Sequence, residues 1–342
     1  MQILNEKKLI GPNVPLIRIE SINVIVGWNH VQFMLCRPGA FLHALLSIPL
    51  LTSCSGDYLY GMKKLFLLSV IMLSGVLYVR AQTTAYKVYA LKFAGSAYPF
   101  TAADWAKGAP QTDSIKFNFM VWLIKGNGRN ILVDAGFLND IDDAKEFKVI
   151  DYIRPDSALS KLGLKAVDIT DIILSHPHWD HIDGVGLFPN AHVWIQKDDF
   201  NYFVGAAWQK GEGSGGFNKR DVRMMVDLNL AGKVTLVDGD NKEIIPGIKV
   251  FTGSRHTFNS EYVWVNTGKN NVVLASDNIW IYYSLDHMVP AADGGTLDPA
   301  GYVKAMQRMK TMVGNIKYIV PGHDAQVFSK FPAVAAGVAE IK

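Results

Sequence analysis

The stretch Ser175–Gly184 constrains what this chain can fold into more than any other part of the sequence. Three imidazoles and a carboxylate fall within six residues, at His176, His178, Asp180 and His181. Such a cluster is costly to assemble in a folded protein unless positive charge holds it together. Nitrogen and oxygen ligands of this kind suit zinc or a similar divalent metal. In an extended turn the first two histidines point to one side, so the later pair can face a second ion.

The run before this stretch, Asp171–Ser175, is short, apolar and rich in β-formers. We expect a buried strand whose end delivers the polar residues to the edge of a sheet. A His-x-His-x-Asp-His motif after such a strand resembles the metallo-β-lactamase superfamily, and the resemblance extends from about Lys87 to the C-terminus. It implies three more ligands, which the chain carries in the expected order: a lone histidine (His256), an aspartate ending a strand (Asp277) and a histidine in a Pro-Gly-His turn (His323).

The resemblance implies a site for two Zn²⁺ ions, with other divalent metals as alternatives. One ion would be held by His176, His178 and His256, the other by Asp180, His181 and His323, and Asp277 would bridge them. Two divalent charges make hydroxide available at neutral pH, and the metal-bridging hydroxide would attack a carbonyl carbon. Asp180 is the expected proton shuttle to the leaving oxygen. The chain has nine histidines, and five of the seven that follow residue 81 fall on this pattern.

The residues around Asp277 narrow the range of possible substrates. An aspartate here, rather than cysteine, argues against β-lactamase activity, and residues 277–290 resemble a loop of N-acyl homoserine lactonases. The function that the resemblance implies is a lactonase of the quorum-quenching kind; the alternative is a zinc-dependent ester, thioester or organophosphate hydrolase. Those lactonases usually carry a tyrosine three residues after the aspartate, where this chain has Trp280, and Tyr282 lies close by. With Asp180, these two are the candidate catalytic residues.

The predicted fold class is α/β, a four-layer αβ/βα sandwich, as the resemblance implies. The apolar run Asn130–Gly136 contains Asp134, for which the resemblance implies a role in orienting a ligand, with a turn aspartate as the alternative. The aromatic segment Asp198–Trp208 is either core or, by the same resemblance, a pocket wall. The last strand is expected at Ile316–Val320. Further strands and helices are predicted at residues 86–93, 117–125, 157–162, 191–196, 233–237, 248–251, 262–266, 271–275 and 299–313.

The N-terminal part of the chain predicts export. Met62–Ala81 has a basic start, an apolar run and a small-residue cleavage site, as in a secretory signal peptide. We therefore expect translation to start at Met62, residues 1–61 to be an upstream extension, and residues 82–342 to form the hydrolase domain, periplasmic or secreted. A lipoprotein anchor at Cys54 is the minor alternative. Both cysteines, Cys36 and Cys54, precede the cleavage site.

Charge narrows the partners. The first 81 residues hold seven of the 34 basic and three of the 31 acidic side chains, which leaves 27 and 28 in the domain, a net charge of −1. A nearly neutral domain has no electrostatic footprint for nucleic acid or an anionic membrane. The expected partner is a small, largely uncharged substrate. No nucleic acid and no stable membrane partner are expected, and association into a homodimer is left open.

Overall fold

The computed structural model describes residues 17–19, 22–26, 30–35, 48–49, 85–209 and 215–342. The chain divides into two compact units, residues 1–82 and 83–342. In the first unit the described residues form an antiparallel sheet in the order β1-β2-β3-β4. Its strands are β1 (Ile17–Ile19), β2 (Ile22–Val26), β3 (His30–Leu35) and β4 (Ile48–Pro49). The predicted signal peptide and the alternative anchor at Cys54 lie outside the described residues, and the start at Met62 stays a prediction.

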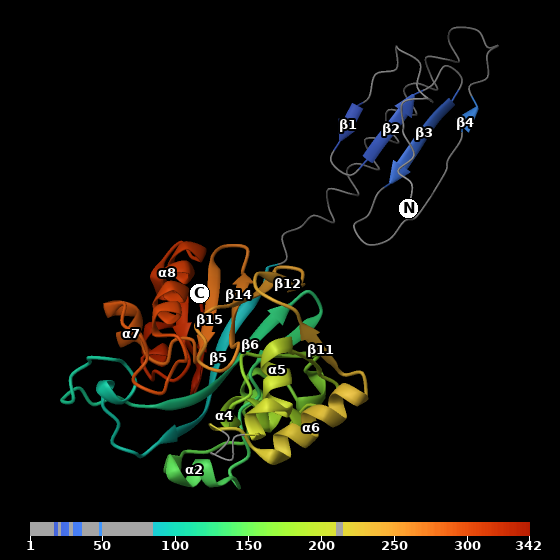
Figure 1. Ribbon diagram of the computed structural model, residues 1–342. Helices are drawn as coiled ribbons and strands as arrows, with labels where there is room; N and C mark the ends of the chain where they lie inside the picture. Colours follow the sequence, from blue (N-terminus) through green and yellow to red (C-terminus); the bar gives the residue numbers. More distant parts are fainter. Residues whose placement is uncertain (1–16, 20–21, 27–29, 36–47, 50–84, 210–214) are drawn as a thin grey trace. The chain divides into compact units, whose positions relative to one another are not determined.

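The second unit contains two mixed sheets (Figure 1). The larger sheet has the strands β5 (Lys87–Ser96), β6 (Asn118–Gly126), β7 (Arg129–Val133), β8 (Val149–Ile150), β9 (Asp171–Leu174), β10 (His192–Gln196), β11 (Val234–Val237), β17 (Ala333–Ala335) and β18 (Val338–Glu340). The smaller sheet has β12 (Lys242–Ile245), β13 (Ile248–Thr252), β14 (Glu261–Asn266), β15 (Asn271–Ser276) and β16 (Ile319–Pro321).

The α-helices of the second unit lie outside these sheets. They are α2 (Asp142–Glu146), α3 (Pro155–Ala158), α4 (Trp179–Ile182), α5 (Lys197–Val204), α6 (Lys219–Leu230), α7 (Tyr282–His287), α8 (Pro299–Met312) and α9 (Val327–Lys330). Helices α5 and α6 contact the edge strand β11 of the larger sheet, whereas α8 contacts β15 of the smaller one. In Figure 1, α8 lies to the left of the strands and α5 and α6 to their right. Among the described residues, no helix combines the length and the apolar character needed to cross a membrane.

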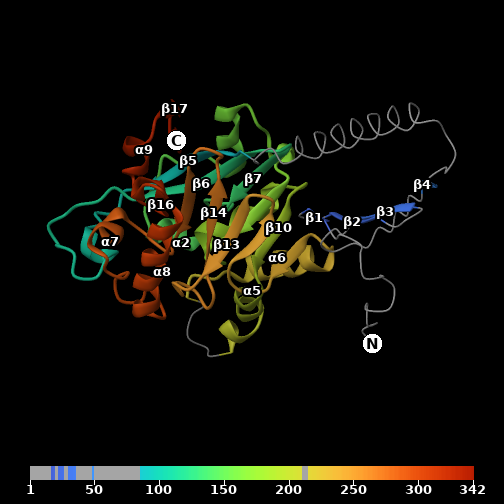
Figure 2. The same ribbon diagram turned by 90° about the horizontal axis from the view of Figure 1, so that it is seen from above.

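The larger sheet runs in the order β11-β10-β9-β7-β6-β5-β18-β17, with β8 beside β5, and the smaller in the order β12-β13-β14-β15-β16 (Figure 2). Strands β7, β9, β10 and β11 are mutually parallel, and the rest of the larger sheet is antiparallel. In the smaller sheet only β15 and β16 are parallel. Parallel strands present their carboxyl ends at one edge, where α/β proteins commonly carry their sites.

Strand β6 shows why the unit is layered. Because successive side chains of a strand point to opposite faces, Trp122 packs into the core between the two sheets while Val121 and Leu123 pack under the outer helices. All three side chains are fully buried. Strands that are apolar on both faces need cover on both sides, and that requirement produces four layers. The predicted α/β sandwich is therefore confirmed.

Two features of the chain's end differ from the prediction. Residues Ile316–Tyr318 form a 3-10 helix rather than the start of a strand, because the side chain of Asn315 accepts a hydrogen bond from the N–H of Lys317 and caps the turn. The strand is only Ile319–Pro321. It is not the last one, because β17 and β18 follow and β18 pairs with β5.

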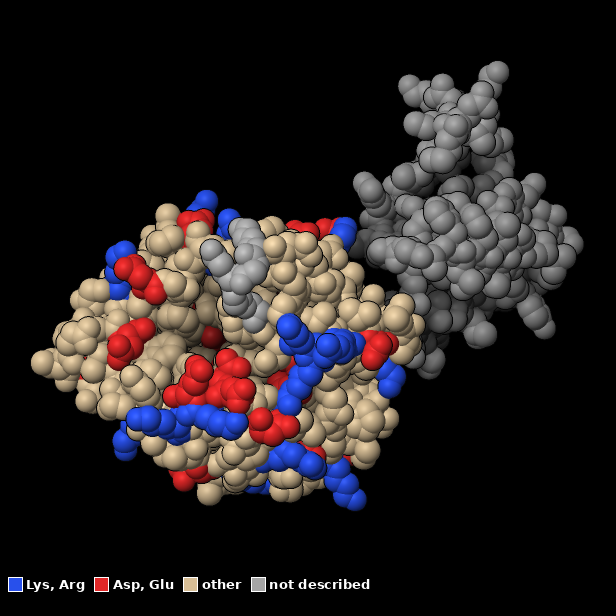
Figure 3. All heavy atoms as spheres, turned by 60° about the horizontal axis from the view of Figure 1, so that its bottom comes forward, with Lys and Arg blue, Asp and Glu red and all other residues tan. Residues whose placement is uncertain are grey.

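Charges of both signs are interspersed over the face drawn in Figure 3. Among the described residues, exposed lysines and arginines pair with nearby aspartates, as Lys145 does with Asp142 at 2.7 Å and Arg220 with Asp140 at 2.8 Å. Interspersed, paired charges attract neither a polyanion nor a polycation strongly.

Candidate metal centre

The loop that carries the histidine motif starts where β9 ends, at Leu174. His176 follows in the turn and is completely buried. His178 is the N-cap residue of α4, and the first turn of that helix carries Asp180 and His181. A strand that ends and a helix that begins within five residues therefore present four polar side chains at one edge of the larger sheet.

The other three predicted ligands follow strands of the smaller sheet. His256 lies in the loop after β13, Asp277 directly follows β15, and His323 comes two residues after β16. Because β15 and β16 are parallel, Asp277 and His323 emerge at the same edge. Both sheets thus deliver their polar residues to one place, between the ends of their strands.

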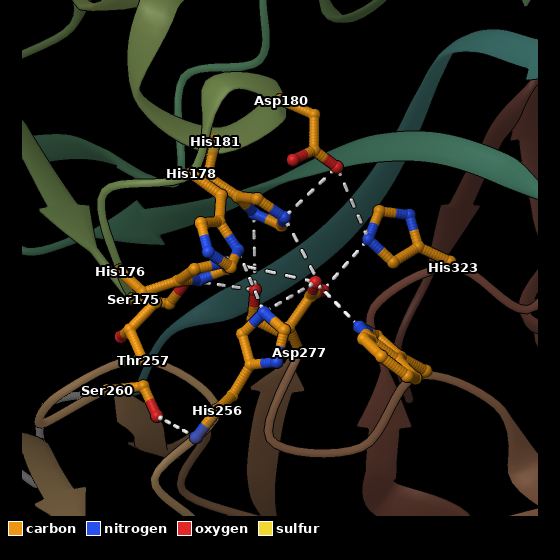
Figure 4. A network of polar contacts seen from close by, with 12 residues as sticks. Ser175, His176, His178, Asp180, His181, His256, Thr257, Ser260, Asp277 and His323 are labelled. Atoms are coloured by element: carbon orange, nitrogen blue, oxygen red, sulfur yellow. Dashed lines mark hydrogen bonds and ion pairs between the residues drawn. The ribbon is translucent and has the colours of Figure 1, made fainter. Parts of the chain in front are cut away.

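The structure brings all seven predicted ligands together in two groups (Figure 4). Within each group, the ligand atoms lie within 4.8 Å of one another. The first group is His176, His178, His256 and Asp277; the second is Asp180, His181 and His323. This division matches the partition that the resemblance implied. The seven side chains come from parts of the chain almost 150 residues apart, so the grouping is a property of the fold and not of the motif alone.

Asp277 faces both groups with one oxygen each. Its Oδ1 lies 2.8 Å from Nε2 of His323 and 3.4 Å from Nε2 of His181. Its Oδ2 lies 3.3 Å from Nε2 of His256 and 3.8 Å from Nε2 of His176. A carboxylate placed in this way can bridge two cations.

The pKa shifts of His176 and His178 in the first group differ in direction from those of His181 and His323 in the second. Burial, strengthened by neighbouring imidazoles, lowers the pKa of His176 well below its ordinary value and that of His178 to about 3. These rings are therefore neutral, the form that binds metal. Burial also acts to lower the pKa of His181, but the facing Asp180 and Asp277 raise it well above its ordinary value. The second group thus favours positive charge, which a proton or a divalent ion can supply.

The donor set fits divalent ions. Two buried atoms at the centre, Nε2 of His181 and Oδ1 of Asp277, make no hydrogen bond of normal geometry with a described residue, although Nε2 of His323 lies 2.8 Å from this Oδ1. A buried polar group without a partner costs about 1–3 kcal/mol, and coordination to a cation would remove that cost. Imidazole nitrogens combined with carboxylate oxygens are typical ligands of Zn²⁺.

Hydrogen bonds behind the ligands fix how the rings are oriented. Nδ1 of His181 lies 2.8 Å from Oδ2 of Asp134, a buried carboxylate that also accepts the main-chain N–H of Ser175 at 2.8 Å. Nδ1 of His256 lies 2.8 Å from the carbonyl of Gly295, and Nδ1 of His323 lies 3.1 Å from a main-chain carbonyl of β6. Each ring donates outward and turns Nε2 to the centre, as in zinc proteins. Asp134 thus lies where the resemblance implied.

The two remaining predicted residues behave differently. Trp280 lines the cavity beside the cluster, and its indole N–H donates to Oδ2 of Asp277 at 2.8 Å. Tyr282 is the first residue of α7, is 3% exposed, and packs in the core with Lys330 over its ring. The structure does not bring Tyr282 to the site. The neighbouring Tyr283 stacks on His287 and also lies outside the cavity lining.

A cavity of about 200 Å³ opens onto both groups of ligands. Its wall is largely aromatic, and among the described residues it includes no lysine and no arginine. The lining residues are Trp105, Phe117, Phe147, His178, Trp179, Asp180, Gly216, His256, Asp277, Trp280, Gly294 and His323. Sequence reasoning missed the first three, because a single apolar residue before or between strands carries no signal that separates a pocket wall from the core.

The aromatic segment Asp198–Trp208 mostly forms core. Phe200 and Phe203 are buried under the larger sheet. Tyr202 stacks on Phe258 at 4.8 Å, and Trp208 borders a different surface hollow. None of these rings lines the cavity at the metal cluster, so of the two predicted roles the structural one applies.

These features define a class: two mixed sheets flanked by helices, with a His/Asp cluster where the strand ends of both sheets meet. A model of the metallo-beta-lactamase superfamily matches residues 120–323, which include all seven ligands. The chain belongs to the metallo-β-lactamase superfamily.

Relatives and solved structures point the same way. The N-acyl homoserine lactonase of Bacillus cereus is 25% identical over 181 residues, which are 52% of this chain and 65% of the lactonase. For the N-acyl homoserine lactonase AttM of Azorhizobium caulinodans, identity is 26% over 175 residues, 50% of this chain and 64% of AttM. The chain thus spans about 65% of the length of these curated relatives.

A crystal structure of a quorum-quenching N-acyl homoserine lactone lactonase covers 74% of this chain and 98% of its own, with a TM-score of 0.58 at 19% identity. The hydrolase AbOPH of the beta lactamase superfamily covers 76% and 95%, with a TM-score of 0.56 at 18% identity. At such identities these similarities establish the fold alone.

Proposed function

We propose that this protein is a dinuclear metal-dependent hydrolase, with zinc as the metal, and that it opens lactones, N-acyl homoserine lactones among them. The observation that carries the proposal is the position of Asp277, whose two oxygens each face one group of ligands. A single-metal or purely structural site has no use for such a carboxylate. The lactone substrate is supported by relatives of that name at 25–26% identity.

Two divalent ions, when bound, would act as Lewis acids and lower the pKa of a water molecule from 15.7 to about 7. The chain's own residues would bind these ions and orient the water. Asp180 lines the cavity, and its Oδ2 lies 3.2 Å from Nε2 of His181 and 3.5 Å from Nε2 of His323. Burial acts to raise the pKa of Asp180, but these two histidines lower it below its ordinary value. Asp180 is therefore ionised and can pass a proton from the attacking water to the leaving oxygen.

The cavity wall favours an uncharged substrate. Trp105, Phe117 and Trp280 form an edge-to-face and tilted ring cluster beside the ligands, and Phe117 stacks on His323 at 4.3 Å. Arg255, the basic residue next to a ligand in sequence, donates to the carbonyl of Phe258 and does not line the cavity. Among the described residues, the wall is largely aromatic and carries no lysine or arginine. Such a wall suits a lactone, ester, thioester or phosphotriester better than a phosphate with free anionic oxygens.

The substrate class is tested with the full chain, loaded with zinc and assayed on acyl-homoserine lactones, aryl esters, thioesters and phosphotriesters. We expect lactone opening in the wild type and a loss of at least about 100-fold in Asp277→Asn, which keeps the shape of the side chain and removes its charge. His192→Gln is the matched control, because His192 bonds Thr235 on the far part of the sheet. Intact lactones together with cleaved thioesters or phosphotriesters would show that the substrate is wrong and the site right.

We also propose that the protein is exported, on the signal-peptide pattern of Met62–Ala81. Sequencing the N-terminus of the natural protein tests this proposal. A mature protein that starts at Gln82 agrees with it, whereas a lipid-modified Cys54 or an uncleaved N-terminus contradicts it.

A further inference from the structure

Trp280 contacts three of the seven ligands in three different ways. Its indole N–H donates to Oδ2 of Asp277 at 2.8 Å. Its main-chain carbonyl accepts the N–H of His323 at 3.0 Å. Its ring meets the imidazole of His256 edge to face, with centroids 5.3 Å apart and an interplanar angle of 77°. One residue thus touches both groups of ligands and the carboxylate between them.

The indole of Trp280 lies so close to Gly295 that no larger residue fits at position 295. A Cβ at Gly295 would lie 2.2 Å from Cη2 of Trp280 and 2.3 Å from its Cζ3, far inside van der Waals contact. The carbonyl of the same glycine lies 2.8 Å from Nδ1 of His256. Gly295 therefore fixes one ligand through its main chain and admits Trp280 through its missing side chain. The indole also packs edge to face against Trp105, with centroids 5.0 Å apart.

The bond to Asp277 uses the only polar capacity that the indole has. An indole carries one N–H donor and no acceptor, so Trp280 cannot donate to a substrate while it holds the carboxylate. A carboxylate turns readily about its terminal torsion. The indole packs against Gly295 and Trp105, and its charge-assisted bond prevents the carboxylate from rotating. One oxygen of Asp277 therefore stays directed toward each group.

We propose that Trp280 is a positioning residue that sets the bridging orientation of Asp277, and not the catalytic donor that the sequence predicted. The inference rests on the proposed dinuclear site. It gives the residue at this position, where the lactonases usually carry a tyrosine, a structural task in metal binding.

The test measures zinc binding in competition with a chromophoric chelator, using the full chain and no substrate. Trp280→Phe keeps most of the ring and removes the N–H, and we expect one of the two ions to bind about 10–100-fold more weakly. Trp194→Phe is the matched control: it also removes an indole N–H that donates to a carboxylate, at 3.1 Å to Oδ1 of Asp171, but this aspartate begins β9, at the end of the strand away from the predicted ligands. We expect its two affinities to stay within about threefold of the wild type.

Gly295→Ala is the second variant, because it displaces the indole without deleting it and leaves the Gly295 carbonyl in place. We expect it to weaken the same ion as Trp280→Phe, with a far-ultraviolet circular dichroism spectrum like that of the wild type. Unchanged affinities in Trp280→Phe, or an equal loss in Trp194→Phe, would overturn the inference. A wild type that binds fewer than two ions would instead overturn the proposed function, so the two failures are distinguishable.

Discussion

Asp134 supports the site from behind, and its replacement gives the most informative prediction. The side chain is fully buried and accepts bonds from the main-chain N–H of Ser175 and from Nδ1 of His181, both at 2.8 Å. Its backbone has φ 60°, a left-handed conformation that Asp and Asn tolerate and Ala does not. Two substitutions therefore separate charge from shape.

Asp134→Ala leaves two buried N–H donors without an acceptor, at about 1–3 kcal/mol each, and adds roughly 1 kcal/mol of backbone strain. It also removes an acceptor of the hydroxyls of Ser175 and Ser276, which keep their bond to each other at 2.9 Å. We expect the free energy of unfolding to fall by about 3–7 kcal/mol, a large part of the usual 5–15 kcal/mol. Asp134→Asn keeps the backbone and one acceptor oxygen but loses the charge. We expect about 1.5–3 kcal/mol of lost stability and a 10–100-fold weaker binding of the ion beside His181.

Urea denaturation with metal and with excess chelator measures both effects, and competition with a chelator measures affinity. Asp142→Asn is the control, because Asp142 is an exposed aspartate paired only with Lys145; its stability should match the wild type. An Asp134→Ala protein within about 1 kcal/mol of the wild type, or an Asp134→Asn protein with unchanged metal affinity, would refute the supporting role.

Four further outcomes follow from the same structure. Gly184→Ala places a Cβ 2.2 Å from the carbonyl oxygen of Ala135, so we expect urea denaturation to show about 3 kcal/mol of lost stability. Arg220→Met removes the bidentate partner of the buried Asp183 and should cost about 1–3 kcal/mol, less in an Asp183→Gly background. Burial, with the facing Asp183, raises the pKa of Asp221 to about 9. The folded state therefore keeps a proton that the unfolded chain releases above about pH 4, and stability should fall by up to about 1.4 kcal/mol per pH unit between about pH 4 and 9. Asp221→Asn should remove that slope in urea denaturations across the range. Chelation of metals present at 1,000 times their Kd should lower the free energy of unfolding by about 4 kcal/mol per site, seen as a lower Tm.

The sequence predicted the ligands well because their chemistry is concentrated. His176, His178, Asp180 and His181 stand in one motif after one apolar strand, and a cluster of that kind has few structural explanations. His256 could be predicted only through the resemblance, since a lone histidine in a loop carries no local signal. The fold was predicted through the resemblance, and the short apolar runs that alternate with helical segments agree with it, because they leave few layer arrangements open.

The parts that the sequence did not predict depend on tertiary packing. Whether Trp105 lines a cavity or fills a core is decided by residues 175 or more positions away: Trp280 packs against its ring, and the N–H of Ala292 donates to its carbonyl at 3.0 Å. Tyr282 is two residues from Trp280, which lines the cavity, yet the first turn of α7 directs Tyr282 into the core. Apolar periodicity predicts that a side chain is buried, but it does not predict whether the side chain lines a cavity or packs in the core.

Helix α6 was missed for a local reason. Lys219–Leu230 is rich in charged residues and begins at Asn218, whose side chain makes no capping hydrogen bond. Its stability comes instead from the buried Met225 and from Arg220, which binds Asp183 of the ligand loop. Those contacts join segments that are about 40 residues apart and leave no trace in a local pattern.

Metal stoichiometry tests the central claim most directly. The full chain, purified, reconstituted with zinc and freed of excess metal, should contain two ions per chain by elemental analysis. His256→Gln should retain one, the ion of the second group, while the control His192→Gln retains two. A wild type that holds one ion or none, or a His256→Gln protein that keeps both, would contradict the account.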